Sequence, residues 1–321
     1  MLLMNLPSEL IILISEFLEN KELSALLQTS SRFANLLGLL LLDRGLSDPK
    51  LEILMWAAAN GDEEIIREIL LRAQHKQIKI PPQVKDSMLM TAVRYQRVDL
   101  LEYLVRTVGA NLSAMLPHKY SVSPRTALHE AAQQGDKVIT QKLIELGAEV
   151  NAIDSEGLAA LHYAVWKPRR EDASADEAWN TDEELEYDVN SLAILRLLLK
   201  HGAQTEVVEP DLGQTPLLWA SIDGNTEAIR VLLDHGADIT ASDSEGCTAL
   251  HSAAESGNPE AVELLIEKGA DIFAISHNAD TPLDVSASEL VREVLRKAGA
   301  LTGPELGREL ERLLHDPQYQ P

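Results

Sequence analysis

Apolar and polar residues recur along most of this chain with two nested periods. Within short segments, apolar residues return every three to four positions, which predicts helices with one buried side. The segments themselves also recur. TPLLWASIDGNTEAIRVLLDHGADITA begins at Thr215, and TALHSAAESGNPEAVELLIEKGADIFA begins 33 positions later at Thr248. A third copy, TALHEAAQQGDKVITQKLIELGAEVNA, begins at Thr126. The double period predicts a stack of repeated helix pairs.

Each recurring residue type has a physical reason to be where it is. Threonine is expected to cap the first helix through its hydroxyl, at Thr126, Thr215, Thr248 and Thr281. Proline at the first helical position, as in Pro216 and Pro282, costs no hydrogen bond. Paired alanines such as Ala253 and Ala254 keep that helix thin, so that neighbouring units can approach each other. A glycine such as Gly257 ends it, and apolar pairs such as Leu265–Ile266 mark the second helix.

These features together resemble the ankyrin repeat, through the 33-residue period, the T-P-L-H-x-A-A box and the L-L-x-x-G-A box. The resemblance implies an all-α solenoid of about seven units over residues 51–300. The first two units are degenerate, and Gln96 stands where glycine is expected. The last unit, from Thr281, is short and more charged, as a terminal cap requires. Residues 301–321 form a tail with one short amphipathic helix over residues 305–314.

One spacing is 22 residues longer than a single period, because Gly147 and Gly202 are 55 positions apart. The extra residues form an acidic insertion at 167–188, between the two helices of the fourth unit. This composition favours a solvated loop. The alternative is a docking strip for a basic partner, anchored by Trp179, Leu185 and Tyr187.

Residues 1–46 do not follow the repeat. Two helical stripes of apolar residues, over 9–18 and 33–41 with leucines between them, predict a compact three-helix module too small to be stable alone. One interpretation is a helical cap on the first repeat.

The same segment resembles an F-box through Leu6-Pro7-x-Glu9-Leu10, Phe17-Leu18, Glu22-Leu23 and Thr29-x-x-Arg32-Phe33. The order of an F-box followed by repeats is similar to that of fungal F-box/ankyrin proteins. The family's module binds the Skp adaptor of cullin–RING ubiquitin ligases. By motif, the adaptor-facing and framework positions would be Leu6, Pro7, Leu10, Ile11, Ile14, Leu18, Leu23 and Leu26. The frequent Cys-Lys/Arg-Arg-Trp end of the box reads Ser30-Ser31-Arg32-Phe33, which is a departure from the family pattern.

The ankyrin resemblance also implies a concave face, made of the turns and first helices, that binds a protein target. Residues at variable positions of that face are the expected target-binding set: Trp56, Arg94, Glu130, Tyr163, Trp166 and Trp219. Aromatic residues of this kind are frequent interface hot spots. The alternative is that the rings pack against neighbouring first helices. Tyr163, Trp166 and Trp219 are expected to form an aromatic patch beside the acidic insertion.

Composition narrows the partner classes. The formal net charge of −23 disfavours nucleic-acid binding and favours partners with basic patches. A protein target with apolar and basic side chains would suit the aromatic patch and the carboxylates around it. A single cysteine, Cys247, suits an intracellular protein of the cytoplasm or nucleus. The apolar N-terminal stretch lacks the basic residues of a signal peptide, and no run is long enough for a membrane helix.

No catalytic chemistry is predicted. His129, His162 and His251 recur once per repeat, so they are interpreted as structural and not as metal ligands or catalytic bases. Phosphate-binding and dinucleotide motifs are absent, and no cofactor is expected. We therefore expect a non-enzymatic substrate receptor of an SCF-type ubiquitin ligase. The alternative is an ankyrin adaptor in which residues 1–46 only cap the array.

Overall fold

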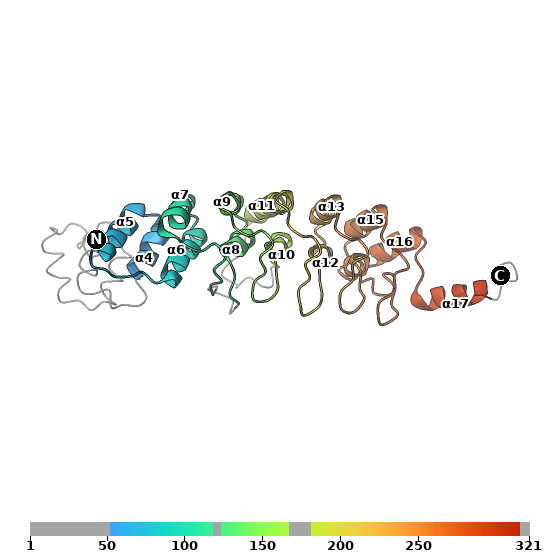
Figure 1. Ribbon diagram of the computed structural model, residues 1–321. Helices are drawn as coiled ribbons and strands as arrows, with labels where there is room; N and C mark the ends of the chain where they lie inside the picture. The colour runs from blue at the N-terminus through green and yellow to red at the C-terminus, as the bar shows by residue number, and fades with distance from the viewer. Residues whose placement is uncertain (1–51, 118–122, 167–180, 315–321) are drawn as a thin grey trace, which may run out of the picture. The chain divides into compact units, whose positions relative to one another are not determined.

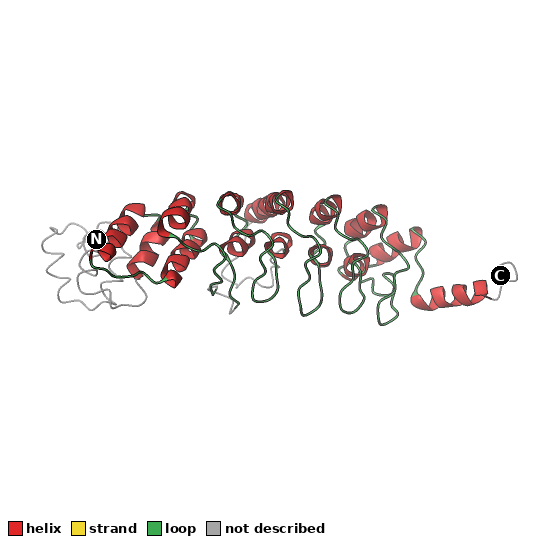
Figure 2. Ribbon diagram, viewed as in Figure 1, coloured by secondary structure: helices red, strands yellow, loops and turns green. Residues whose placement is uncertain are grey.

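The computed structural model describes residues 52–117, 123–166 and 181–314 (Figure 1). The described chain is helical and contains isolated β-bridges but no strand (Figure 2). Its helices are α4 (Glu52–Asn60), α5 (Glu63–His75), α6 (Pro82–Arg94), α7 (Val98–Tyr103), the π-helix η2 (Leu104–Val108), α8 (Ala127–Gln133), α9 (Lys137–Glu145), α10 (Ala160–Val165), α11 (Thr181–Lys200), α12 (Pro216–Ile222), α13 (Thr226–Asp234), α14 (Ala249–Glu255), α15 (Pro259–Glu267), α16 (Glu289–Lys297) and α17 (Gly303–Leu314). The predicted all-α class is confirmed. The F-box-like module at residues 1–46 lies outside the described residues.

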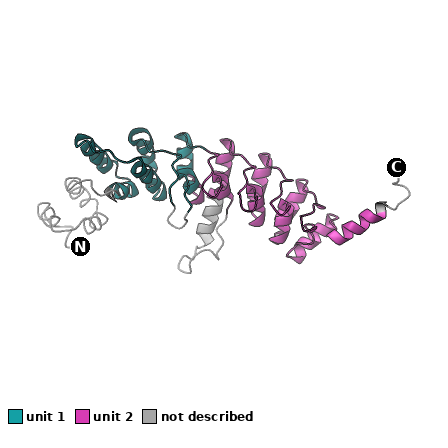
Figure 3. Cartoon of the chain, turned by 60° about the horizontal axis from the view of Figure 1, so that its bottom comes forward, with its two compact units in different colours: residues 1–131, 138–149 teal, residues 132–137, 150–321 magenta. Residues whose placement is uncertain are grey.

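The chain divides into two compact units (Figure 3). Unit 1 comprises residues 1–131 and 138–149, and unit 2 comprises residues 132–137 and 150–321. The described helices of each unit form pairs that stack on one another. In unit 1, α4 contacts both its partner α5 and the next first helix, α6. In unit 2, α12 contacts its partner α13 and the next first helix, α14.

The helix termini follow from local sequence. An Asn, Asp or Ser side chain accepts a hydrogen bond from a backbone N–H in the first turn of several second helices, which satisfies a donor that the helix leaves free. Asp62 accepts from Ile65 at 3.1 Å in α5, and Asn258 accepts from Ala261 at 2.9 Å in α15. Thr215 caps α12 as predicted, since its hydroxyl accepts from the Leu218 N–H at 3.4 Å.

The paired alanines are buried, as the thin first helix requires. Ala57, Ala58, Ala253 and Ala254 have no exposed surface. Leucines of the second helices fill the space beside them, and Leu232 and Leu265 are also fully buried. The core of each unit is therefore a row of small residues from first helices packed against aliphatic residues from second helices.

The loop predicted over the acidic insertion, residues 167–188, is wrong at its C-terminal end. Residues 181–188 form the first turns of α11, a single helix of 20 residues that ends at Lys200. Its start reads Thr181-Asp-Glu-Glu, which are residue types that stabilise a helix N-terminus, and no glycine or proline follows before Gly202. Residues 167–180 lie outside the described part of the chain.

The helix predicted after Thr281 is also absent, because residues 282–284 form a turn and no helix begins before Glu289. Asp284 occupies the position, three residues after Thr281, that histidine has in other repeats. Its carboxylate accepts from the Thr281 hydroxyl at 2.7 Å and from the Gly303 N–H at 2.7 Å. These bonds hold a turn instead of a helix and connect it to the start of α17.

Gln96 has the left-handed backbone of the glycine that it replaces, with φ of +56°. Such a conformation strains a residue that carries a Cβ. We expect Gln96→Gly to raise the free energy of unfolding by about 1 kcal/mol. Gln96→Ala, which keeps the Cβ, should give no comparable gain. Urea denaturation followed by circular dichroism measures both, and equal midpoints for the two variants would contradict the strain argument.

Candidate functional site

The described part of unit 2 contains four hairpin turns, and one recurring hydrogen-bond acceptor organises each of them. The acceptors are Asp154, Glu209, Asp243 and Ser276. In each turn, the acceptor residue's own N–H donates to a carbonyl four or five residues later, as from Asp243 to Cys247 at 3.0 Å. Its side chain accepts from N–H groups inside the turn, as Asp243 does from Cys247 at 2.8 Å. These turns therefore have a fixed backbone shape.

Histidine connects a first helix to the hairpin of the next repeat. The Nδ1 atom of His251 accepts from the Thr248 N–H at 3.1 Å, so a neutral ring carries its proton on Nε2. That Nε2 lies 3.1 Å from the Asp280 carbonyl oxygen of the next hairpin, to which it can donate. The structural role predicted for this histidine is confirmed. The Thr248 hydroxyl lies 2.9 Å from the same Nδ1 atom.

Burial lowers the pKa of His162 and of His251, because an imidazolium is costly away from water. Protonating Nδ1 of His251 would also remove the acceptor that holds Thr248. The unfolded chain takes up these protons near its ordinary pKa of about 6.5. The stability from neutral histidine is therefore present above about pH 6.5 and is lost as pH falls through the lower folded pKa.

We accordingly expect the urea midpoint of the wild-type chain to fall between pH 7 and pH 5. His251→Gln retains a polar side chain but does not titrate, so its midpoint should change less over the same interval. Carboxyl groups in water have pKa values of about 4, below this window. An identical pH dependence in the two proteins would contradict a contribution from His251.

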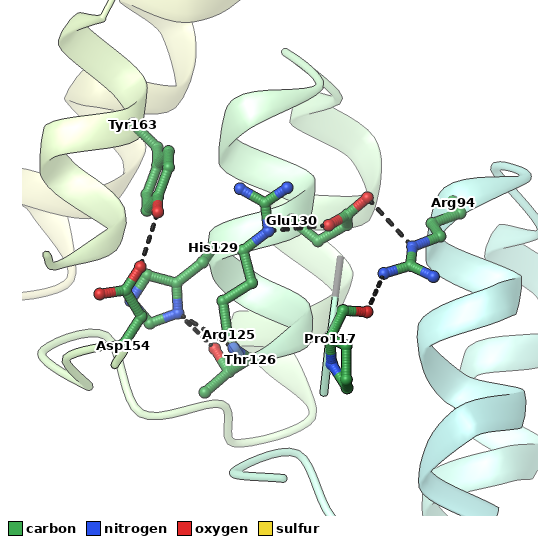
Figure 4. Close-up of polar contacts among 8 residues, drawn as sticks. All are labelled: Arg94, Pro117, Arg125, Thr126, His129, Glu130, Asp154 and Tyr163. Atoms are coloured by element: carbon green, nitrogen blue, oxygen red, sulfur yellow. Dashed lines mark hydrogen bonds and ion pairs between the residues drawn. The ribbon is translucent and has the colours of Figure 1, made fainter. Parts of the chain in front are cut away.

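The aromatic residues predicted to bind a target have different surroundings. The Tyr163 side chain is 7% exposed, and its hydroxyl donates to Asp154 at 2.6 Å (Figure 4). Trp219 is half-buried and meets His162 edge to face, with ring centroids 5.3 Å apart. This contact is the packing against a neighbouring first helix that the alternative predicted. Trp56 and Trp166 are half-buried.

The two charged residues of the same predicted set belong to one ion network in unit 1 (Figure 4). Glu130 is 1% exposed, and its two carboxylate oxygens lie 3.3 Å from Arg94 Nε and 3.0 Å from Arg125 Nε. Arg94 also donates to the Pro117 carbonyl at 2.7 Å. Glu130 and Tyr163 are therefore held inside the fold, while Arg94 and the three tryptophans keep some exposed surface. The Skp-facing residues predicted at positions 6–26 lie outside the described ranges.

The described residues include the single cysteine of the chain, Cys247. Burial first, and then nearby carboxylates such as Asp243 and Glu245, raise the pKa of the Cys247 thiol to about 11. The thiol is therefore protonated at neutral pH. No group of three His, Cys, Asp or Glu residues in the described ranges is arranged to hold a metal ion. Among the helices described, none has the length and apolar character needed to cross a membrane.

Comparisons with known proteins match the repeats. A family model for ankyrin repeats in three copies matches residues 187–276, and a single-repeat model matches residues 125–155. The mouse B-cell lymphoma 3 protein homolog is 28% identical over 231 residues, which are 71% of this chain and 45% of that protein. Human palmitoyltransferase ZDHHC13 is 36% identical over 162 residues, which are 50% of this chain and 22% of that protein. The chain thus spans less than half of each relative.

The crystal structure of the ankyrin repeat domain of Bcl-3, described as a unique member of the IkappaB protein family, has the same architecture. It superposes with a TM-score of 0.60 at 26% sequence identity, and the match covers 76% of this chain and 97% of that domain. Residues 125–155 and 187–276 are therefore ankyrin repeats, and the described chain has the fold of an ankyrin-repeat solenoid.

Proposed function

We propose that this chain is a protein-binding substrate receptor of an SCF-type cullin–RING ubiquitin ligase. In this proposal the ankyrin repeats bind a target, and residues 1–46 recruit the Skp-type adaptor. The chain itself performs no chemistry and takes no cofactor. Ubiquitin transfer would belong to partner subunits, and the receptor would contribute by bringing the target close to them. An intracellular location, in cytoplasm or nucleus, is part of the same proposal.

The binding role of the repeats rests on the hairpin turns of unit 2. Hydrogen bonds inside each turn fix its backbone, as in Asp154 accepting from Glu156 and Leu158 at 2.9 Å. The side chains at the turn tips remain exposed, including Glu156, Asp211 and Glu245. A surface that is fixed before binding loses less conformational entropy when a partner arrives. This arrangement suits recognition of a protein.

The ligase role rests on the N-terminal sequence alone. The Leu6-Pro7-x-Glu9-Leu10 start and the Phe17-Leu18 and Leu23-x-x-Leu26 positions favour adaptor binding. The competing proposal is a scaffold without a link to ubiquitin, in which this segment covers the first repeat. The two proposals differ in one measurable property, which is binding of the Skp adaptor.

A pull-down with purified Skp adaptor separates them. The intact chain should capture the adaptor, and the double variant Leu6→Ala/Pro7→Ala should not. Leu310→Ala, which changes an exposed leucine on α17, is the matched control and should behave like the wild-type chain. Failure of the intact chain to bind would reject the ligase role and favour the plain adaptor. Equal capture by the double variant would reject the assigned adaptor-facing residues.

A further inference from the structure

The four hairpins of unit 2 lie side by side along one edge (Figure 1). We call residues 152–158, 207–214, 241–247 and 274–280 the finger edge. Backbone hydrogen bonds connect neighbouring fingers, from Ser244 N–H to Leu212 carbonyl and from His277 N–H to Glu245 carbonyl, both at 2.8 Å. Gly157 approaches Pro210 so closely that a Cβ would lie 2.5 Å from its ring. The finger edge is therefore a continuous surface made of segments held in register.

An aliphatic side chain is exposed at the same place on three of these fingers. Ile153, Val208 and Ile275 each come immediately before the turn acceptor of their hairpin. Their side chains are 51%, 50% and 50% exposed. Single exposed apolar residues are common, but a row at one structural position is not explained by folding. Leu212, at the tip of the second finger, is 49% exposed as well.

Carboxylates accompany this row. Glu156, Asp211 and Glu245 each stand two residues after the acceptor of their hairpin, and all three are exposed. Asn278 has the equivalent place in the fourth finger. The tip carboxylates are distinct from Asp154 and Asp243, whose oxygens hold the turns from inside.

Within the described residues of unit 2, lysine and arginine lie away from the finger edge. The described fingers and first helices of unit 2, residues 150–166, 203–225, 237–258 and 270–288, contain no lysine or arginine. The described lysines and arginines of unit 2 lie on or directly after second helices, or on α17: Lys137, Arg196, Lys200, Arg230, Lys268, Arg292, Arg296, Lys297, Arg308 and Arg312. The described part of the finger edge thus combines exposed aliphatic side chains with carboxylates and carries no lysine or arginine of its own.

We propose that the finger edge binds a protein segment that presents lysine or arginine together with aliphatic side chains. The aliphatic residues of the partner would contact the row of Ile153, Val208 and Ile275. Its cations would lie between the carboxylates of Glu156, Asp211 and Glu245. The inference rests on the proposed protein-binding role of the repeats and names the chemistry of their partner. Nucleic acids and anionic membranes carry the charge that this surface repels.

The test uses the full chain and a defined probe, a fluorescein-labelled peptide of repeated Leu-Lys-Ser units. A second peptide of equal length and charge replaces every leucine with serine. Binding is measured by fluorescence anisotropy at about 0.15 M salt, where distant charges are screened. We expect the leucine-containing peptide to bind at least about tenfold more tightly than the serine peptide, since only it can fill the aliphatic row.

Two triple variants test the two halves of the surface. Ile153→Ser/Val208→Ser/Ile275→Ser should weaken the Leu-Lys-Ser peptide by about tenfold, to the affinity of the serine peptide. Glu156→Gln/Asp211→Asn/Glu245→Gln should weaken both peptides by about tenfold. The matched charge control, Glu227→Gln/Glu260→Gln/Glu263→Gln, removes three exposed carboxylates from α13 and α15 and should change affinity less than about twofold. Leu290→Ser on α16 is the control for an exposed aliphatic residue.

Each outcome of these binding measurements either supports the proposed site or overturns it. Equal weakening by the two charge-neutralising variants would mean that the peptide senses overall charge, and it would overturn the proposed site. No binding to the wild-type chain, or equal binding of both peptides, would also overturn it. Unchanged circular dichroism and urea midpoints confirm that each variant is folded. The result is independent of Skp capture, so failure of the ligase role and failure of this surface are distinguishable.

Discussion

Replacing Glu130 with alanine is expected to lower the free energy of unfolding by about 3–5 kcal/mol, one of the two largest effects that we expect from a single substitution. Glu130 is buried with Arg125, which is only 2% exposed. Removing the carboxylate leaves a guanidinium in a poorly hydrated place without its counter-charge. The midpoint of urea denaturation measures the loss.

A paired replacement separates the value of the ion pair from the cost of breaking it. Glu130→Leu/Arg125→Met replaces both charges with apolar side chains of similar size, and such exchanges are often close to neutral. We expect this double variant to be more stable than Glu130→Ala by at least about 2 kcal/mol. A double variant as unstable as the single one would show that packing, and not charge, accounts for the loss.

The network also explains why Glu130 differs from its expected role. Sequence position predicted a variable residue on the binding face, next to the histidine of the T-A-L-H box. Arg125 precedes that box and reaches the carboxylate at 3.0 Å, while Arg94 comes from α6 of the preceding repeat. Arg94, which is 36 positions from Glu130 in the sequence, therefore helps to determine whether the Glu130 side chain is exposed or held inside the fold. The repeat pattern contains no information about such an irregular partner.

The parts of the fold that depend on local chemistry were predictable. The period, the alanine pairs and the cap at Thr215 each follow from a few neighbouring residues. Gln96 shows that the pattern even predicts backbone conformation where the expected residue is missing, since its φ is +56°. The failures have local causes too. Residues 181–188 have an acidic composition that favours a loop, yet acidic residues are equally suitable for a helix N-terminus.

The candidate site was predicted less well, because exposure depends on what packs against each side chain. Tyr163 and Trp219 occupy equivalent positions in successive repeats, but only Tyr163 has the Asp154 carboxylate within hydrogen-bonding distance. The row of Ile153, Val208 and Ile275 was missed altogether. Its signal is present in the sequence, since each residue comes directly before the organising residue of a turn. The row can be recognised in the sequence only after the structure has identified which residues are the turn acceptors.

The second large effect is expected at Gly157, where Gly157→Ala should lower the free energy of unfolding by about 2–4 kcal/mol. Its φ of +79° disfavours a Cβ, and that Cβ would lie 2.5 Å from Cγ and Cδ of Pro210. Both problems arise at the contact between the first two fingers of unit 2. The loss should therefore include both a backbone cost and a steric cost.

Gly236→Ala isolates the backbone cost, because Gly236 has a similar φ of +87° but no atom within 4 Å of the position that a Cβ would take. We expect it to lose only about 1 kcal/mol. Pro210→Ala removes the two ring atoms, so the double variant Gly157→Ala/Pro210→Ala should recover part of the steric cost, which a double-mutant cycle measures. If Gly157→Ala and Gly236→Ala are equally destabilised, the fingers are not in close contact at this point. In that case the finger edge would lose the fixed register on which its binding of a basic segment depends.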